Sequence, residues 1–237
     1  METLHKNLTS RAFNGLVHHR LVIAPLTKDV SSINRTYRHK IDAVAKAKSN
    51  RDWGHFVSLH EKPYRLDALV AATKYGLKEK PSEFWELLGR VWIDTENAHQ
   101  HPKKWRQLWT ETTEGRRACM SDEDLRIFDS LPEQIEVWRG TSHKRGHAGL
   151  SWTRDREMAV FFARRLCYGS RVPLLAKGIV NKIDVLAYFG ERDEQEIVSM
   201  KVSVISVTES KDVLSDAARN SSISIGELCA KDSNCKN

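Results

Sequence analysis

Cysteine is scarce in this sequence, and its spacing matches no metal or redox motif. The 237 residues include four cysteines, and none of them forms a Cys-x-x-Cys pair. This spacing argues against a zinc ribbon and against a thioredoxin-type redox site. We expect reduced thiols, and a disulfide between Cys229 and Cys235 only if the protein leaves a reducing compartment.

Long apolar segments are also missing. No run approaches the roughly 18 to 20 apolar residues that a membrane-spanning helix requires. The first residues, METLHKNLTSRAF, lack the apolar stretch of a secretion signal. The sequence therefore predicts a cytoplasmic protein with no membrane partner.

Acidic residues are in deficit, and the deficit is concentrated near the N-terminus. The formal net charge is +7, and residues 1–62 hold eleven lysines and arginines against five acidic residues. Localised positive charge attracts nucleic acid or an acidic protein surface. A solvated, lysine-rich surface explains the same charge, because no nucleic-acid-binding motif accompanies it. We expect residues 1–62 to contribute to target binding.

Helical spacing dominates the sequence before Pro132. Apolar residues at helical spacing predict a helix over Tyr64 to Gly76, and the glycine suits its C-terminal end. Ser82 is expected to cap the next helix, and Pro102 to open another. Ser121 and Asp124 have a spacing typical of the start of a further helix.

After Pro132 the spacing between apolar residues shortens to about every second residue, as in strands. Strands are predicted at 135–141, 173–182, 185–189, 196–200 and 202–207. One helix interrupts them, expected to be capped by Thr153 and to bury Met158, Phe161, Phe162 and Leu166. This order predicts an α+β protein. It comprises a basic, mainly helical region at 1–131, a strand-rich core at 132–210 and a polar tail at 211–237.

Three short segments place polar residues at the ends of these strands: Val137 to Thr141 (VWRGT), Gly149 to Thr153 (GLSWT) and Arg192 to Val198 (RDEQEIV). A charged Arg139 beside apolar residues needs a partner. Ser151 lies two residues too early to cap the helix, so its hydroxyl is available for another role. Glu194 and Glu196 are expected on one strand face, where their charges repel each other. Taken singly, each segment is also explained by an exposed strand end, an internal salt bridge or a solvated surface.

Together, the three segments resemble the arginine, Ser-x-Thr, Glu-x-Glu signature of the mono-ADP-ribosyltransferases, in the same chain order. The match spans residues 135–207, under a third of the chain. The layout is similar to that of bacterial and phage-encoded family members. The resemblance implies two small, roughly perpendicular sheets that form an NAD cleft within 132–210, joined to the helical N-terminal region. It also implies NAD as cosubstrate, and the host cytoplasm as location if the protein is phage-encoded.

The resemblance further implies a role for each site residue. Glu196 would face the positive charge that develops on the ribose as nicotinamide leaves. Arg139 would bind a phosphate or ribose oxygen of NAD, and Gly140 would let the backbone approach the nicotinamide amide. Ser151 would hold Glu196 in place, and Thr153 would brace the same turn. Phe162 would contact the nicotinamide ring, although core packing explains it as well.

Glu194 decides the expected acceptor. In this family, a glutamate two residues before the catalytic glutamate goes with arginine as acceptor. The resemblance therefore implies transfer to arginine on a target protein, and leaves a nucleic acid or a small guanidino compound open as other acceptors. The same site would serve an NAD glycohydrolase, in which water replaces the acceptor. A non-catalytic basic binding module is the alternative from another class. No metal is expected, because His143 and His147 lack a third ligand.

Overall fold

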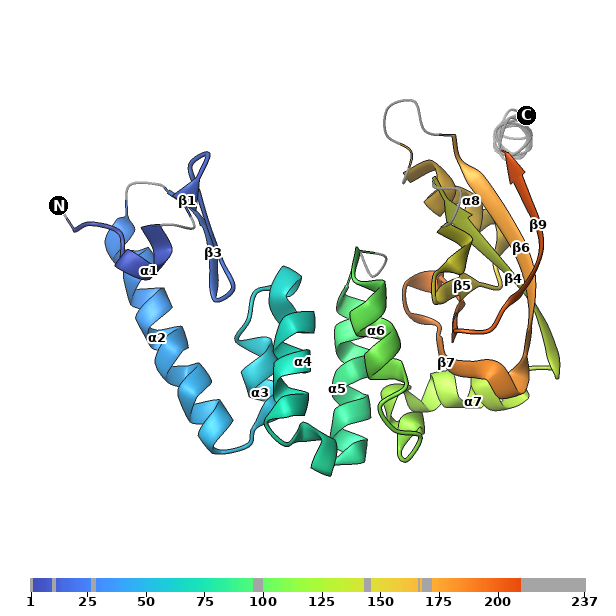
Figure 1. Cartoon of the computed structure of the whole chain (residues 1–237), viewed down its shortest axis with the longest axis horizontal. Helices are drawn as coiled ribbons and strands as arrows, with labels where there is room; N and C mark the ends of the chain where they lie inside the picture. The colour runs from blue at the N-terminus through green and yellow to red at the C-terminus, as the bar shows by residue number, and fades with distance from the viewer. Residues whose placement is uncertain are drawn as a thin grey trace, which may run out of the picture. The chain divides into compact units, whose positions relative to one another are not determined.

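A computed structural model divides the chain into two compact units, Met1–Ser121 and Asp122–Asn237 (Figure 1). The structure describes residues 2–9, 12–26, 29–95, 100–142, 146–165, 167 and 172–209. The boundary between the units lies after Ser121, ten residues before the predicted boundary after residue 131. The reason is that helix α7 (Asp122–Ser130) packs against a strand of the second unit. The predicted tail at 211–237 lies outside the described residues, as do His143, Leu166, Cys229 and Cys235.

The first unit opens with a small antiparallel sheet that the sequence analysis missed. Its strands are β1 (Ala12–Phe13), β2 (Leu16–His19) and β3 (Val22–Pro25), and a short helix, α1 (Lys6–Thr9), precedes them. An apolar cluster packs β2 and β3 against α1 and helix α2 (Val30–Ser49); its buried members are Leu8, Val17, Leu21, Val22, Ile33 and Tyr37. Strands of two to four residues are too short for a two-residue period to become visible in the sequence.

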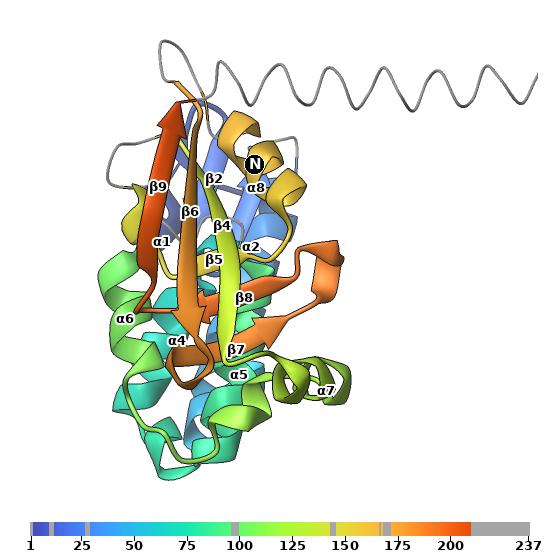
Figure 2. The ribbon, with the colours of Figure 1, turned by 90° about the vertical axis from the view of Figure 1, so that its right-hand side faces the viewer.

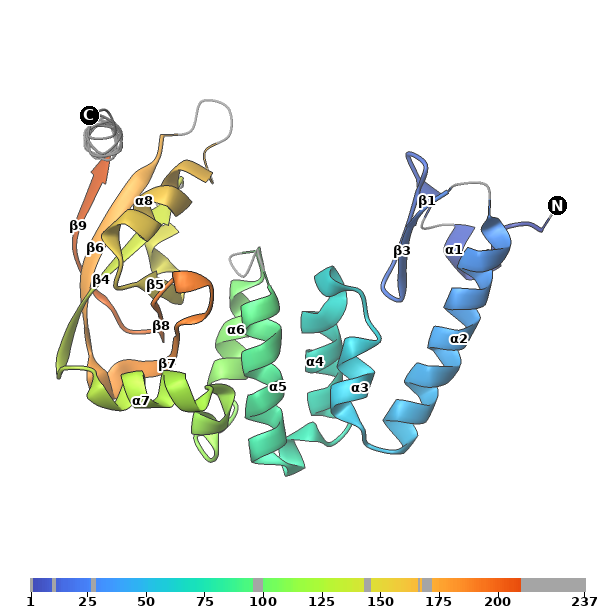
Figure 3. The same ribbon diagram turned by 180° about the vertical axis from the view of Figure 1, so that it is seen from behind.

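The rest of the first unit is helical, as predicted. Its helices are α2, α3 (Trp53–Ser58), α4 (Arg65–Lys74), α5 (Pro81–Asp94) and α6 (Pro102–Trp109), with single turns η1 (Lys62–Tyr64), η2 (Leu77–Glu79) and η4 (Arg116–Cys119) (Figures 1 and 3). None of the helices in the described part of the chain is both long and apolar enough to cross a membrane.

Before Pro132, the helix ends follow the sequence signals in three of four cases, one of which is Ser121, directly before α7. Gly76 has φ of 115°, which favours glycine just after α4, and Pro102 is the first residue of α6. Ser82 is not the cap of α5, because the helix begins one residue earlier, at Pro81, which has no N–H to satisfy. Ring contacts between Trp92 and both Trp105 and Trp109 then fix α5 against α6.

In its described residues, the second unit combines one antiparallel sheet with the helices α7 and α8 (Arg156–Arg165). The strands are β4 (Gln134–Thr141), β5 (Ser151–Thr153), β6 (Leu174–Asn181), β7 (Val185–Phe189), β8 (Glu196–Ser199) and β9 (Ser203–Glu209). Single turns η5 (Gly146–Ala148), η6 (Lys182–Asp184) and η7 (Glu191–Asp193) connect them. The mixture of helices and antiparallel strands confirms the α+β class.

The strand order is β7-β8-β5-β4-β6-β9 in one sheet, where two small, roughly perpendicular sheets were expected. Its two parts are joined weakly, because the pairing of β4 with β5 rests on the residue pair Trp138 and Thr153. Figure 2 shows that β7 and β8 run across the direction of β4, β6 and β9. The six strands thus form one hydrogen-bonded sheet that changes direction at β5.

Helix α8 covers the sheet with small residues, which corrects the predicted apolar face. Ala159, Val160 and Ala163 are buried, whereas Phe161 is 54% exposed. The reason is Gly140 on β4, where a Cβ atom would lie 2.0 Å from the carbonyl oxygen of Ala159. The backbones of helix and strand therefore approach too closely for the large side chains predicted at this contact.

The residue that caps α8 lies two positions later in the sequence than expected. Asp155 accepts hydrogen bonds from the backbone N–H groups of Glu157 (2.8 Å) and Met158 (3.2 Å), so Asp155 is the N-cap. Thr153 instead accepts from the Asp155 N–H at 2.9 Å and belongs to strand β5.

Candidate active site

Arg139 lies near the end of β4 and is held by the loop that follows it. Its Nε donates to the carbonyl oxygen of Gly146 at 2.8 Å, and its Nη1 donates to the carbonyl oxygen of Ser151. Gly149 completes the enclosure, because a Cβ at this position would lie 2.3 Å from the guanidinium carbon. The guanidinium thus fixes the backbone between β4 and β5 while keeping further N–H donors for another ligand.

Burial lowers the pKa of Arg139 to about 10, and the negative charge of Glu196 acts in the opposite direction. A pKa near 10 leaves the guanidinium fully charged at neutral pH. The effect of Glu196 also means that the two side chains interact through space, although they come from non-adjacent strands, β4 and β8. The binding of NAD expected of Arg139 stays a prediction.

Glu196 is the first residue of β8 and is only 8% exposed. It lies directly opposite Thr153 of β5 on one side and Phe189 of β7 on the other. Ser151 occupies the diagonal position on β5, two residues from Thr153, so Ser151, Thr153 and Glu196 share one face of the sheet. The hydrogen bond expected from Ser151 to Glu196 stays a prediction.

Thr153 braces the turn before Glu196, as its expected role requires. This buried hydroxyl donates to the carbonyl oxygen of Glu194 at 2.6 Å and accepts from the Asp155 N–H. The backbone N–H of Arg154 donates to the Gln195 carbonyl oxygen at 3.2 Å, next to this contact. Two adjacent hydrogen bonds therefore tie the end of β5 to the segment that leads into β8.

Glu194 does not share a strand face with Glu196, contrary to the sequence prediction. Strand β8 begins only at Glu196, and Glu194 follows the turn η7 in a helical backbone conformation. Its neighbours Asp193 and Gln195 have φ of 56° and 44°, a left-handed conformation uncommon outside glycine. Such strain often marks functional loops, and here it turns Glu194 away from the regular alternation of the strand.

The glycine at position 140 has a packing reason that the sequence did not reveal. Its Cα lies against the backbone of α8, with the nitrogen of Ala163 only 2.3 Å from a hypothetical Cβ. Its contact with the nicotinamide amide stays a prediction. Phe162 is half-buried on α8 and lies against Phe161, with ring centroids 5.6 Å apart. Its contact with the nicotinamide ring also stays a prediction.

Two residues at this site were missed by the sequence reasoning. Asp124 of α7 is buried and accepts a hydrogen bond from the Gly190 N–H at 2.8 Å, so it fixes the start of the loop that carries Glu194. Gly149, which faces Arg139, was quoted in a motif without a role of its own. Of these two residues, only Asp124 carried a sequence signal, its spacing from Ser121. That spacing indicated the start of a helix and not the hydrogen bond to Gly190, which lies 66 residues further along the chain.

Metal ligands do not gather in the described part of the chain, where no group of three or more histidine, cysteine, aspartate or glutamate side chains could hold an ion. Neither Cys119 nor Cys167 forms a disulfide within the part of the chain that the structure describes.

Comparisons with protein-family models, curated proteins and solved structures find no match for this chain.

Proposed function

We propose that this chain is a mono-ADP-ribosyltransferase, which moves ADP-ribose from NAD to an acceptor and releases nicotinamide. The observation that carries the proposal is the interaction of buried Glu196 with Arg139, on the sheet where Ser151 and Thr153 face the glutamate. Buried charges are costly, so a glutamate and an arginine in such positions favour a functional site, with an internal structural pair as the alternative.

The chemistry assigns different tasks to the two charges. The bond between C1′ of the ribose and the nicotinamide nitrogen breaks, and its electron pair leaves with nicotinamide. Positive charge then develops on the ribose, and the carboxylate of Glu196 stabilises it. The spare guanidinium donors of Arg139 bind the anionic part of NAD, for which a planar donor is better suited than an ammonium group.

Transfer is completed when an acceptor lone pair forms the new bond at C1′. With arginine as acceptor, the attacking nitrogen loses a proton, and Glu194 is the base proposed to receive it. The strained loop at 193–195 presents this residue, and Thr153 and Asp124 fix the loop at its two ends.

Water is the alternative acceptor, which would make the protein an NAD glycohydrolase. The position of Glu194 outside β8 favours this alternative, because hydrolysis needs Glu196 and Arg139 but no residue that selects arginine. The two reactions differ only in the fate of ADP-ribose.

Purified protein incubated with NAD labelled in the adenylate part tests both reactions. Nicotinamide release above a no-protein control is expected. A cell lysate supplies acceptors, and separate protease and nuclease digestion shows whether the label is on protein or on nucleic acid. Nicotinamide release without incorporated label indicates a glycohydrolase, and no release overturns the proposal.

A further inference from the structure

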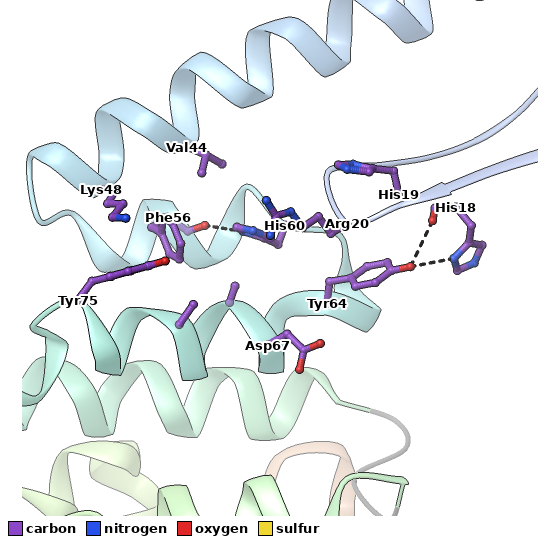
Figure 4. A pocket seen from close by; sticks show the side chains of 12 residues that line it. His18, His19, Arg20, Val44, Lys48, Phe56, His60, Tyr64, Asp67 and Tyr75 are labelled. Atoms are coloured by element: carbon purple, nitrogen blue, oxygen red, sulfur yellow. Dashed lines mark hydrogen bonds between the residues drawn. The ribbon is translucent and has the colours of Figure 1, made fainter. Parts of the chain in front are cut away.

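A cavity of about 570 Å³ opens in the first unit, remote in sequence from the residues of the candidate active site. It lies between α2 and α4, and its walls also come from α3, β2 and the turn after β2 (Figure 4). Small-molecule sites typically have volumes of about 300 to 1,000 Å³. The cavity therefore has the size of a ligand site.

Hydrogen bonds and an ion pair hold the walls together. The hydroxyl of Tyr64 donates to the carbonyl oxygen of His18 at 3.3 Å, and the N–H of Glu61 donates to the carbonyl oxygen of Arg20 at 2.9 Å. Lys40 of α2 pairs with the Glu61 carboxylate at 2.7 Å. The cavity is thus enclosed by elements that are linked to one another.

Two cations face this cavity from opposite ends. Arg20 lies in the turn after β2, and the Nζ of Lys48 lies 3.5 Å from the ring centroid of Tyr75. Within the described ranges, neither cation has a carboxylate partner. The acidic residue of the lining, Asp67, is neutralised by an ion pair with Lys104. The cavity therefore attracts an anion.

His60 adds a hydrogen-bond acceptor. Its Nδ1 lies 2.9 Å from the carbonyl oxygen of Phe56, which can only accept, so Nδ1 carries the proton and donates. Burial lowers the pKa of His60, and the charges of Arg20 and Lys40 lower it further, against the hydrogen bond to Phe56. The neutral ring leaves Nε2 as an acceptor for a ligand N–H.

The remaining lining suits a flat apolar ring. Val44, Phe56, Ala68 and Ala71 provide apolar surface, and the ring of Tyr75 is 46% exposed at the rim. A ligand that matches all three features carries an anionic group, a planar ring and an N–H donor on that ring. Inorganic phosphate lacks the ring, and an acidic peptide has a flat ring with an N–H donor only where it contains tryptophan or histidine.

We propose that this cavity binds a nucleoside phosphate. The phosphate lies at one of the two cationic ends, Arg20 or Lys48. The base lies against Phe56 and the alanines of α4, with a base N–H donating to His60. The ligand is a free nucleotide or one nucleotide of a single-stranded nucleic acid. All lining residues lie between 18 and 75, in the first unit, so this proposal does not rest on the proposed NAD cleavage.

Titration of the full chain with AMP, adenosine and inorganic phosphate tests the ligand class by calorimetry. AMP is expected to bind on the order of 10-fold or more tightly than either fragment, because each fragment lacks one set of contacts. A short adenine oligonucleotide is titrated in parallel. Tighter binding of the oligonucleotide identifies nucleic acid as the source of the nucleotide, and tighter binding of AMP identifies the free form. Binding of neither overturns the proposal.

A matched pair of double variants locates the site. Arg20→Gln with Lys48→Gln should weaken AMP binding on the order of 10-fold or more. Lys46→Gln with Lys103→Gln removes the same charge from exposed positions outside the cavity and should leave the affinity within about 2-fold. Equal losses in both would mean a general charge effect and would contradict the proposal.

AMP is also a fragment of NAD and could therefore bind at the proposed NAD site instead of in the cavity. A variant of the NAD site distinguishes the two locations. Arg139→Lys should leave AMP affinity unchanged if the nucleotide binds between α2 and α4. Loss of AMP binding in Arg139→Lys, with retention in the cavity variant, would overturn the proposal. Tyr75→Leu gives an independent change at the rim and should weaken AMP binding. Unchanged melting temperatures confirm that the variants remain folded.

Discussion

The Cα of Gly149 lies against the guanidinium group of Arg139, so closely that a Cβ at position 149 would come within 2.3 Å of the guanidinium carbon. The group that would have to move is the end of a flexible side chain, while the backbone around it can stay in place. A single methyl group can therefore displace Arg139 without removing any of its donors.

Gly149→Ala should thus raise the KM for NAD on the order of 10-fold, because it misplaces one charged contact. It should also lower the thermal stability, because the displaced guanidinium loses its hydrogen bonds to the carbonyl oxygens of Gly146 and Ser151. Gly54→Ala is the matched control, since its Cβ would meet no heavy atom nearer than 3.8 Å. Nicotinamide release at varied NAD concentration measures the effect. An unchanged KM in Gly149→Ala would mean that Arg139 does not bind NAD.

Glu196→Gln removes the negative charge proposed to face the ribosyl cation. Both hydrolysis and transfer should fall on the order of 100-fold or more, since one electrostatic contact in the transition state is lost. Glu209→Gln, on the exposed strand β9, controls for the change in net charge. If the Glu196→Gln variant still releases nicotinamide at the original rate, Glu196 is not catalytic and its charge near Arg139 serves only the structure.

Glu194→Gln should separate the two reactions. Glu194 lies in the loop before β8 and acts only on the acceptor, so nicotinamide release should persist while labelling of an arginine-rich acceptor falls. Both quantities are measured in one reaction. Equal loss of both activities, or undiminished labelling, would remove the case for arginine as the acceptor.

Ser151 and Thr153 should differ in what their hydroxyl groups do. Thr153→Val keeps the shape of the side chain but leaves the Glu194 carbonyl oxygen and the Asp155 N–H without their partner. We expect a loss of about 1 to 3 kcal/mol in the free energy of unfolding, measured by urea denaturation. Ser151→Ala should change stability less and NAD cleavage more. The opposite pattern would make Ser151 the structural residue of the pair.

Local patterns predicted those parts of the fold that depend on local physics. Strand β7 was predicted with its observed bounds, and the start of α6 at Pro102 was predicted because proline fits the first helical turn. The buried face of α8 was wrong, because contact with the distant Gly140 selects small residues there. The position of Glu194 was wrong for a similar reason: a turn with two left-handed residues interrupts the expected strand.

The candidate site was predictable only in part. The motif spacing identified Arg139 and Glu196, which lie on strands β4 and β8 of one sheet, and the charge of Glu196 opposes the lowering of the Arg139 pKa by burial. Nothing in the spacing indicated that Asp124 would hold the loop at Gly190, because that contact depends on how α7 packs against β7. The cavity between α2 and α4 was equally hidden, since its lining comes from several separate elements.

His60 should make the stability of the protein depend on pH in a defined direction. Burial is the main cause of its lowered pKa, and Arg20 and Lys40 add to the effect. Well above the ordinary histidine pKa of about 6.5, His60 is neutral in both the folded and the unfolded protein, so it contributes no pH dependence. Below that value the unfolded chain takes up the proton first. The free energy of unfolding should therefore fall as the pH falls, by at most about 1.4 kcal/mol per pH unit from this residue, until the folded protein is also protonated.

Comparison with His60→Gln isolates this contribution. The substitution should cost stability at about pH 7.5, where the hydrogen bond to Phe56 is intact, and the difference from the unsubstituted protein should shrink towards about pH 5.5. His101→Gln, at an exposed position, serves as the control and should keep a constant difference. Urea denaturation at both pH values provides the measurement. A difference that stays constant for His60→Gln, or that grows as the pH falls, would show that His60 is protonated as readily in the folded protein as in the unfolded chain.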